Sequence, residues 1–133
     1  MKIALDLDNT ITADKNSVEF FRIITHLLIP EHRIYILTNR ETGTEQEIAE
    51  ELDYLGIEYS EIVITAQKAD YITANNINIF FEDTDKCLLD LPEKVTVFKI
   101  REAGNFSFAE RKWVGSSKTT KMIDRWKNKN KNR

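Results

Sequence analysis

The chain has 133 residues, of which 41% are hydrophobic and 31% are charged, and its formal net charge is −3 at pH 7. These values are those of an ordinary soluble globular protein of one domain. A single cysteine excludes a disulfide framework, and no apolar run approaches the roughly 20 residues that a membrane helix needs. We therefore expect a cytoplasmic protein with no membrane partner.

Charge is distributed unevenly along the chain. Residues 1–110 hold 10 Lys and Arg against 21 Asp and Glu, whereas residues 111–133 hold 9 against one. This basic tail ends in a low-complexity run, residues 127–133, that lacks the apolar residues that would order it, so we expect disorder over residues 124–133. The expected organisation is a folded domain at 1–103, an irregular extension packed on it at 104–123, and the tail.

Apolar runs and amphipathic stretches alternate along the first 100 residues. This alternation predicts βαβ units in a three-layer, doubly wound, Rossmann-like α/β domain with about five parallel strands. In chain order, the predicted elements are the strand Lys2–Leu7, the helix Ser17–Ile29, the strand Arg33–Leu37, a helix between Thr44 and Gly56, the strand Ile62–Ile64, the helix Gln67–Asn75, the strand Ile77–Phe81, the helix Asp85–Leu91 and the strand Val95–Ile100.

Local signals predict the ends of two helices. Asn16 or Ser17 is expected to cap the first helix at its N-terminus. In the second helix, Thr44 and Glu47 have the spacing of a capping box. Gly56 follows that helix at the position of a left-handed C-terminal cap.

Two carboxylates follow the first predicted strand. Asp6 and Asp8 are two residues apart, so strand alternation lets them project on the same side at the carboxyl end of the strand. Open α/β sheets bind their ligands at that edge. Leaving both acids ionised in one pocket is costly unless a cation lies between them, and Mg²⁺ is the natural candidate because it takes carboxylate oxygens.

The pattern Asp6-x-Asp8-x-Thr10 after an apolar strand resembles the first motif of the haloacid dehalogenase-like (HAD) hydrolases. Three further features, which together with it span residues 1–100, follow in that family's order: Thr38-Asn39 at the end of the second strand, Lys68 at the start of a helix, and Glu82-Asp83-Thr84-Asp85 at the end of the fourth strand. The family's topology would place the first strand between the second and the fourth, so that their carboxyl ends meet.

The resemblance implies a catalytic role for four side chains. Asp6 would attack phosphorus and form an aspartyl-phosphate. Asp8 would protonate the leaving oxygen and then activate water. Thr38 would donate a hydrogen bond to the transferring phosphoryl group, and Lys68 would offset negative charge.

The resemblance also implies a metal site and a substrate rim. Asp83 would bind Mg²⁺ together with Asp6 and the backbone carbonyl of Asp8. Glu82 stands where the family more often has glycine, so Glu82, Asp83 or both are candidate ligands. The candidate substrate contacts are Asn9, Thr10 and Asn39, whereas Arg40 is expected to be a solvated side chain.

Only a short segment separates Thr10 from the next helical pattern, and one helix and one strand fill the segment from Asn39 to Lys68, so no cap domain is expected. The resemblance to small capless phosphatases and nucleotidases implies a Mg²⁺-dependent phosphomonoesterase acting on a small phosphorylated metabolite, with nucleotides as the favoured class. One alternative is a phosphatase acting on a nucleic acid end or another macromolecule docked by the basic tail; nucleic acid is not the favoured partner. Another alternative is a non-catalytic phosphate-binding regulatory module. Capless members of this family often close the site through oligomerisation, so an oligomer is compatible with the sequence.

Two further predictions concern the end of the domain. Cys87 falls on the inward face of the fourth predicted helix, where a small core residue is expected. Gly104-Asn105 predicts a turn, with no role assigned to it.

Overall fold

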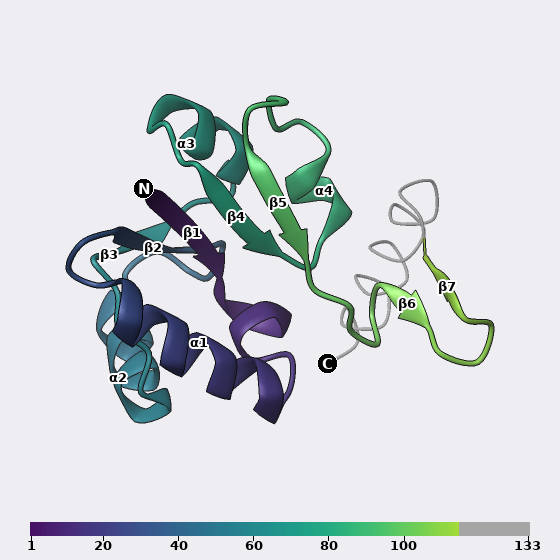
Figure 1. Cartoon of the computed structure of the whole chain (residues 1–133), viewed down its shortest axis with the longest axis horizontal. Helices are drawn as coiled ribbons and strands as arrows, with labels where there is room; N and C mark the ends of the chain where they lie inside the picture. Colours follow the sequence, from purple (N-terminus) through teal and green to yellow (C-terminus); the bar gives the residue numbers. More distant parts are fainter. Residues whose placement is uncertain (115–133) are drawn as a thin grey trace.

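A computed structural model describes residues 1–114, so the predictions for 115–133, including the basic tail, lie outside the described residues. Five strands form one parallel sheet in the order β3-β2-β1-β4-β5 (Figure 1). The strands are β1 (Lys2–Asp6), β2 (Arg33–Thr38), β3 (Glu61–Ile64), β4 (Ile79–Glu82) and β5 (Thr96–Lys99). The predicted α/β class is confirmed, and β1 lies between β2 and β4 as expected.

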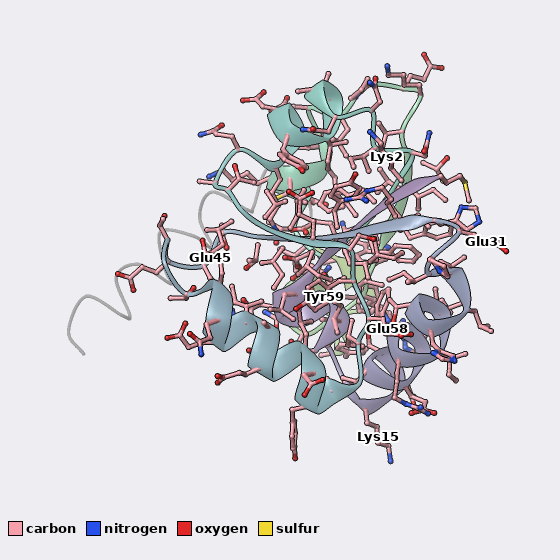
Figure 2. The ribbon with its side chains drawn as sticks, turned by 90° about the vertical axis from the view of Figure 1, so that its left-hand side faces the viewer. Lys2, Lys15, Glu31, Glu45, Glu58 and Tyr59 are labelled. Carbon is pink, nitrogen blue, oxygen red and sulfur yellow. The ribbon has the colours of Figure 1, made fainter. Side chains whose placement is uncertain are left out.

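Helices cover both faces of the sheet (Figures 1 and 2). Alternation along β1 explains the two cores, because Ile3 and Leu5 pack with α1 and α2 whereas Ala4 packs toward α3 and α4. The result is a three-layer, Rossmann-like arrangement. No helix within residues 1–114 has the length and apolar character that crossing a membrane requires. The helices are α1 (Lys15–Leu28), α2 (Glu45–Leu55), α3 (Lys68–Ala74) and α4 (Asp85–Leu88).

The structure corrects the predicted N-terminal caps of both helices on the first face. Asp14 caps α1, because its carboxylate accepts a hydrogen bond of 2.8 Å from the backbone N–H of Ser17. At α2 no capping box forms, because the Thr44 hydroxyl donates to the backbone oxygen of Glu41 at 2.6 Å instead. Gly56 ends α2 at φ 75°, so the predicted left-handed cap is confirmed.

The predicted first strand is one residue too long. β1 ends at Asp6, and the chain then makes an irregular helical turn, η1 (Leu7–Ile11). Asn9 adopts a left-handed conformation within this turn, at φ 61°, which asparagine tolerates better than most residues. The turn buries Leu7 and Thr10 and brings the Thr10 side chain back under the end of β1.

A two-stranded antiparallel hairpin follows the sheet. It consists of β6 (Phe106–Ser107) and β7 (Lys112–Trp113) and lies beyond the carboxyl end of β5 (Figure 1). The ring of Phe106 makes edge contacts with Phe108 and Trp113 at centroid distances of 5.2 and 5.3 Å. Within the expected irregular extension, residues 104–114 are therefore partly ordered as a hairpin.

Candidate active site

A pocket of about 500 Å³ opens at the carboxyl ends of β1 and β4. This is the point at which the strand order reverses, because β1 leads to β2 on one side and pairs with β4 on the other. Doubly wound sheets bind their ligands at such a point. The pocket is lined by Asp6, Asp8, Asn9, Asn39, Ala66, Lys68, Glu82, Asp83, Thr84, Lys86 and Cys87.

Asp6 lies at the inner end of this pocket and is 5% exposed. Its Oδ1 accepts a hydrogen bond of 2.6 Å from Lys68 Nζ, and its Oδ2 accepts one of 2.8 Å from Thr10 Oγ1. Both carboxylate oxygens are therefore held in place by side chains from other elements. This fixed orientation is what a carboxylate nucleophile requires.

Lys68 is buried, and its ammonium is shared between two acids. As predicted, it is the first residue of α3, and its Nζ also donates to Glu82 Oε2 at 3.2 Å. Burial alone would lower the pKa of Lys68, but the charges of Asp6 and Glu82 outweigh burial, so the pKa is raised. The side chain therefore stays positive inside the site.

Three buried acids meet next to Lys68. Asp6, Glu82 and Asp83 each offer an oxygen, and these oxygens all lie within 4.8 Å of one another. Burial, and next the charge of Asp6, raises the pKa of Glu82 to about 8. Burial, and next a hydrogen bond with Asp6, raises the pKa of Asp83 to about 7. The single positive charge of Lys68 does not neutralise three acids. The cluster's donor atoms are all carboxylate oxygens, and such a set fits Mg²⁺.

Asp8 takes a different position from Asp6. It lies at the exposed rim, where its two oxygens accept hydrogen bonds of 3.0 and 2.7 Å from Nε and Nη2 of Arg40. The same guanidinium contacts Glu51 on α2, at 2.6 Å from its Nη1. The prediction that Arg40 is a solvated side chain is wrong, because the two acids hold it and leave it 28% exposed.

The two threonines of the predicted site are buried. Thr10 does not line the pocket; its hydroxyl lies 2.8 Å from Asp6 Oδ2 and 3.2 Å from Asp83 Oδ1 and orients both acids. It is therefore a positioning residue, and the predicted substrate contact is not seen. Thr38 is 1% exposed, and its Oγ1 accepts a hydrogen bond of 3.3 Å from the backbone N–H of Arg40.

The turn after β5 is hydrogen-bonded to the acidic end of β4. The side-chain nitrogen of Asn105 donates hydrogen bonds of 2.7 Å to the backbone oxygens of Asp83 and Ile100. Its side-chain oxygen accepts a hydrogen bond of 2.8 Å from the backbone N–H of Glu102. The predicted turn at Gly104-Asn105 thus positions a candidate metal ligand.

The pocket rim carries polar side chains from three segments. Asn9 follows β1, Asn39 follows β2 and Lys86 belongs to α4, and all three are exposed. Cys87 packs against the second core, as predicted, but it also lines the pocket. Burial, and next the charge of Glu82, raises the pKa of its thiol to about 12, so it is no nucleophile at neutral pH.

Sequence reasoning missed Lys86 and the roles of Arg40 and Asn105. Lys86 had a usable signal, because it lies three residues after Asp83 at the start of a helix. Arg40 and Asn105 had none, because their partners are distant in the sequence and neither lies in a periodic pattern.

Comparisons with protein-family models, with curated proteins and with solved structures find no match to this chain.

Proposed function

We propose that this protein is a Mg²⁺-dependent phosphomonoester hydrolase of the HAD-like kind, without a cap domain, and that it acts in the cytoplasm on a small phosphorylated metabolite such as a nucleotide. The observation that supports this most is the setting of Asp6. Its carboxylate is buried and oriented at the base of a pocket, beside one lysine and two further acids. The proposed membership of the HAD-like hydrolases rests on the four motifs in the sequence.

In the first step, a carboxylate oxygen of Asp6 attacks phosphorus and forms an acyl-phosphate bond. The bond between phosphorus and the ester oxygen breaks, and Asp8 gives its proton to that oxygen, so the alcohol leaves. Asp8 lines the pocket, and both of its oxygens are held by Arg40. For this proton transfer one oxygen of Asp8 takes up a proton and turns to the leaving group, while Arg40 keeps its hydrogen bond to the other oxygen and orients the carboxyl.

In the second step, water attacks phosphorus and the bond to Asp6 breaks. Asp8 now takes the proton from the water, so inorganic phosphate leaves and Asp6 is restored. Lys68 remains positive throughout and balances the charge that develops next to Asp6.

The acids of the buried cluster, Asp6, Glu82 and Asp83, would hold Mg²⁺. When bound, the ion supplies charge neutralisation for these acids and for the phosphate oxygens. The pKa values of Glu82 and Asp83, raised to about 8 and about 7, support this assignment because burial leaves both acids short of positive charge. The backbone carbonyl of Asp8 remains a predicted fourth ligand.

The pocket supports a small substrate. Its volume of about 500 Å³ lies in the range of pockets that take metabolites and is larger than a phosphate group needs. Docking of a nucleic acid by the basic tail would depend on residues outside the described part of the chain. We therefore favour a small metabolite over a nucleic acid as the substrate.

The test is phosphate release from nucleotides, sugar phosphates and phosphorylated oligonucleotides, with Mg²⁺ and with chelator. We expect Mg²⁺-dependent release that Asp6→Asn abolishes, and an acyl-phosphate that can be trapped on Asp6. Asp53→Asn, which changes an exposed aspartate on α2, is the matched control. Release that is unaffected by Asp6→Asn would overturn the proposal.

A further inference from the structure

The charged side chains around the site are almost all paired. Lys68 contacts Asp6 and Glu82, Arg40 contacts Asp8 and Glu51, and Lys99 contacts Asp85. Lys86 lines the same pocket and forms no ion pair with any of residues 1–114. It is the second cation of the pocket lining, and no acid within residues 1–114 pairs with it.

No acid within residues 1–114 forms an ion pair with Lys86, and the three acids that precede it are held elsewhere. Asp85 precedes it in α4, but Lys99 Nζ lies 2.6 Å from Asp85 Oδ1. Glu82 and Asp83 lie inside the cluster and are 1% and 6% exposed. Lys86 itself is exposed and lines the pocket, so its side chain is accessible to solvent and to a ligand bound there.

Two amides share this rim with Lys86. The side chains of Asn9 and Asn39 are exposed, and neither makes a side-chain hydrogen bond within the described chain. The buried end of the pocket is acidic. At the rim, Arg40 pairs with the one acid, Asp8, and the ammonium of Lys86 and two amides remain as donors. The two ends therefore suit two different parts of one ligand.

We propose that Lys86 binds a second anionic group of the substrate, a carboxylate or another phosphate, while the phosphate to be cleaved lies at Asp6. This inference rests on the proposed function and narrows its substrate class. A substrate with a single phosphate leaves Lys86 facing water. A substrate with a second anion gains a charge-assisted contact at the rim.

The test compares substrates that differ by one anionic group. Suitable pairs are a nucleoside 5′-monophosphate with its 3′,5′-bisphosphate, and phosphoethanolamine with phosphoserine. Each is assayed with the wild-type protein, with Lys86→Gln, and with Lys94→Gln as control. Lys94 is an exposed lysine of the segment between α4 and β5 and does not line the pocket.

We expect the wild-type protein to prefer the member with two anions in at least one pair, by about tenfold in kcat/KM, the size of one charge-assisted contact. Lys86→Gln should remove that preference mainly through KM and leave the single-anion substrate within about twofold, and Lys94→Gln should change neither. Equal loss on both members, or no loss on either, would overturn the role of Lys86 while leaving the hydrolase intact.

A binding measurement covers the case in which no substrate turns over. The affinity of the same pairs is then measured by calorimetry with Mg²⁺ present. A preference for two anions that Lys86→Gln removes would support the rim site even if the hydrolase proposal fails. Equal affinity of wild type and Lys86→Gln for every ligand would overturn it.

Discussion

The side-chain amide of Asn105 donates a 2.7 Å hydrogen bond to the backbone oxygen of Asp83. A residue of the turn after the sheet therefore fixes the acidic end of β4, at the inner end of the pocket. Asn105 also bridges Ile100 and Glu102, so one buried side chain makes three hydrogen bonds.

Asn105→Ala should lower both stability and Mg²⁺ affinity. It removes the Asn105 partner of one buried and two partly buried backbone groups, which costs about 2–3 kcal/mol of unfolding free energy. It also frees the end of β4, so the Mg²⁺ concentration for half-maximal activity should rise. Urea titration and Mg²⁺ titration check the two effects. The control is Ser107→Ala, which removes one exposed hydrogen bond in the same hairpin; equal effects of both variants would contradict the prediction.

Lys68→Met should abolish activity and destabilise the fold. The ammonium lies 2.6 Å from Asp6 and 3.2 Å from Glu82, and removing one partner of a buried ion pair costs about 3–5 kcal/mol. Adding Glu82→Leu should recover part of this stability, because the second substitution removes one acid that has lost its cation. Chemical unfolding of the single and double variants measures the coupling energy between Lys68 and Glu82. Strictly additive losses of unfolding free energy would exclude such a coupling.

Arg40→Ala should lower kcat by about tenfold or more while leaving the Mg²⁺ requirement unchanged, because Arg40 orients Asp8 and does not touch the buried acids. Steady-state kinetics at several Mg²⁺ concentrations separates the two effects. The control is Arg22→Ala, which breaks an exposed ion pair with Glu19 on α1 and should have little effect. A change in Mg²⁺ affinity equal to the change in kcat would refute a role through Asp8.

The metal-free protein should lose stability as pH rises from about 5 to about 8. Glu82 and Asp83 have pKa values of about 8 and about 7 in the folded chain, against 4.5 and 3.8 as ordinary values. The folded state therefore binds more protons than the unfolded state in this window, and unfolding free energy falls as those protons are lost. Mg²⁺ replaces the protons, so its stabilising effect should grow with pH.

Urea midpoints across this pH range, with chelator and with Mg²⁺, test this dependence. Glu82→Gln should flatten the curve in chelator, whereas Glu93→Gln, which changes an exposed glutamate before β5, should not. A urea midpoint in chelator that rises from pH 5 to pH 8 would contradict the prediction, because it would mean that the negative charges of Glu82 and Asp83 do not destabilise the metal-free fold.

The sequence predicts the centre of this site well because strand order brings the strand ends together. Asp6 ends β1 and Asp83 directly follows the neighbouring parallel strand β4, so hydrophobic runs and crossovers suffice to place them near each other. Lys68 could be placed too, because it begins the helix after β3. These positions depend on the backbone topology, which periodic patterns encode.

The periphery could not be predicted in the same way. Thr44 has the right spacing for a capping box, yet its hydroxyl finds a closer acceptor in the backbone oxygen of Glu41. Arg40 reaches Asp8 and Glu51 through a long side chain, and no periodic pattern encodes such a contact. The direction of a polar side chain depends on partners that only the folded chain supplies.

The hydrogen bond from Asn105 to Asp83 also determines how much of the chain must be present before the site is complete. Asp6 ends the first strand, but the residue that secures Asp83 follows every strand of the main sheet. A nascent chain that has not yet emerged past Asn105 can pair its strands but leaves the end of β4 unfastened. The proposed activity therefore depends on a residue outside the main sheet, and a chain that stops before Asn105 would carry Asp6 beside an end of β4 that nothing holds in place.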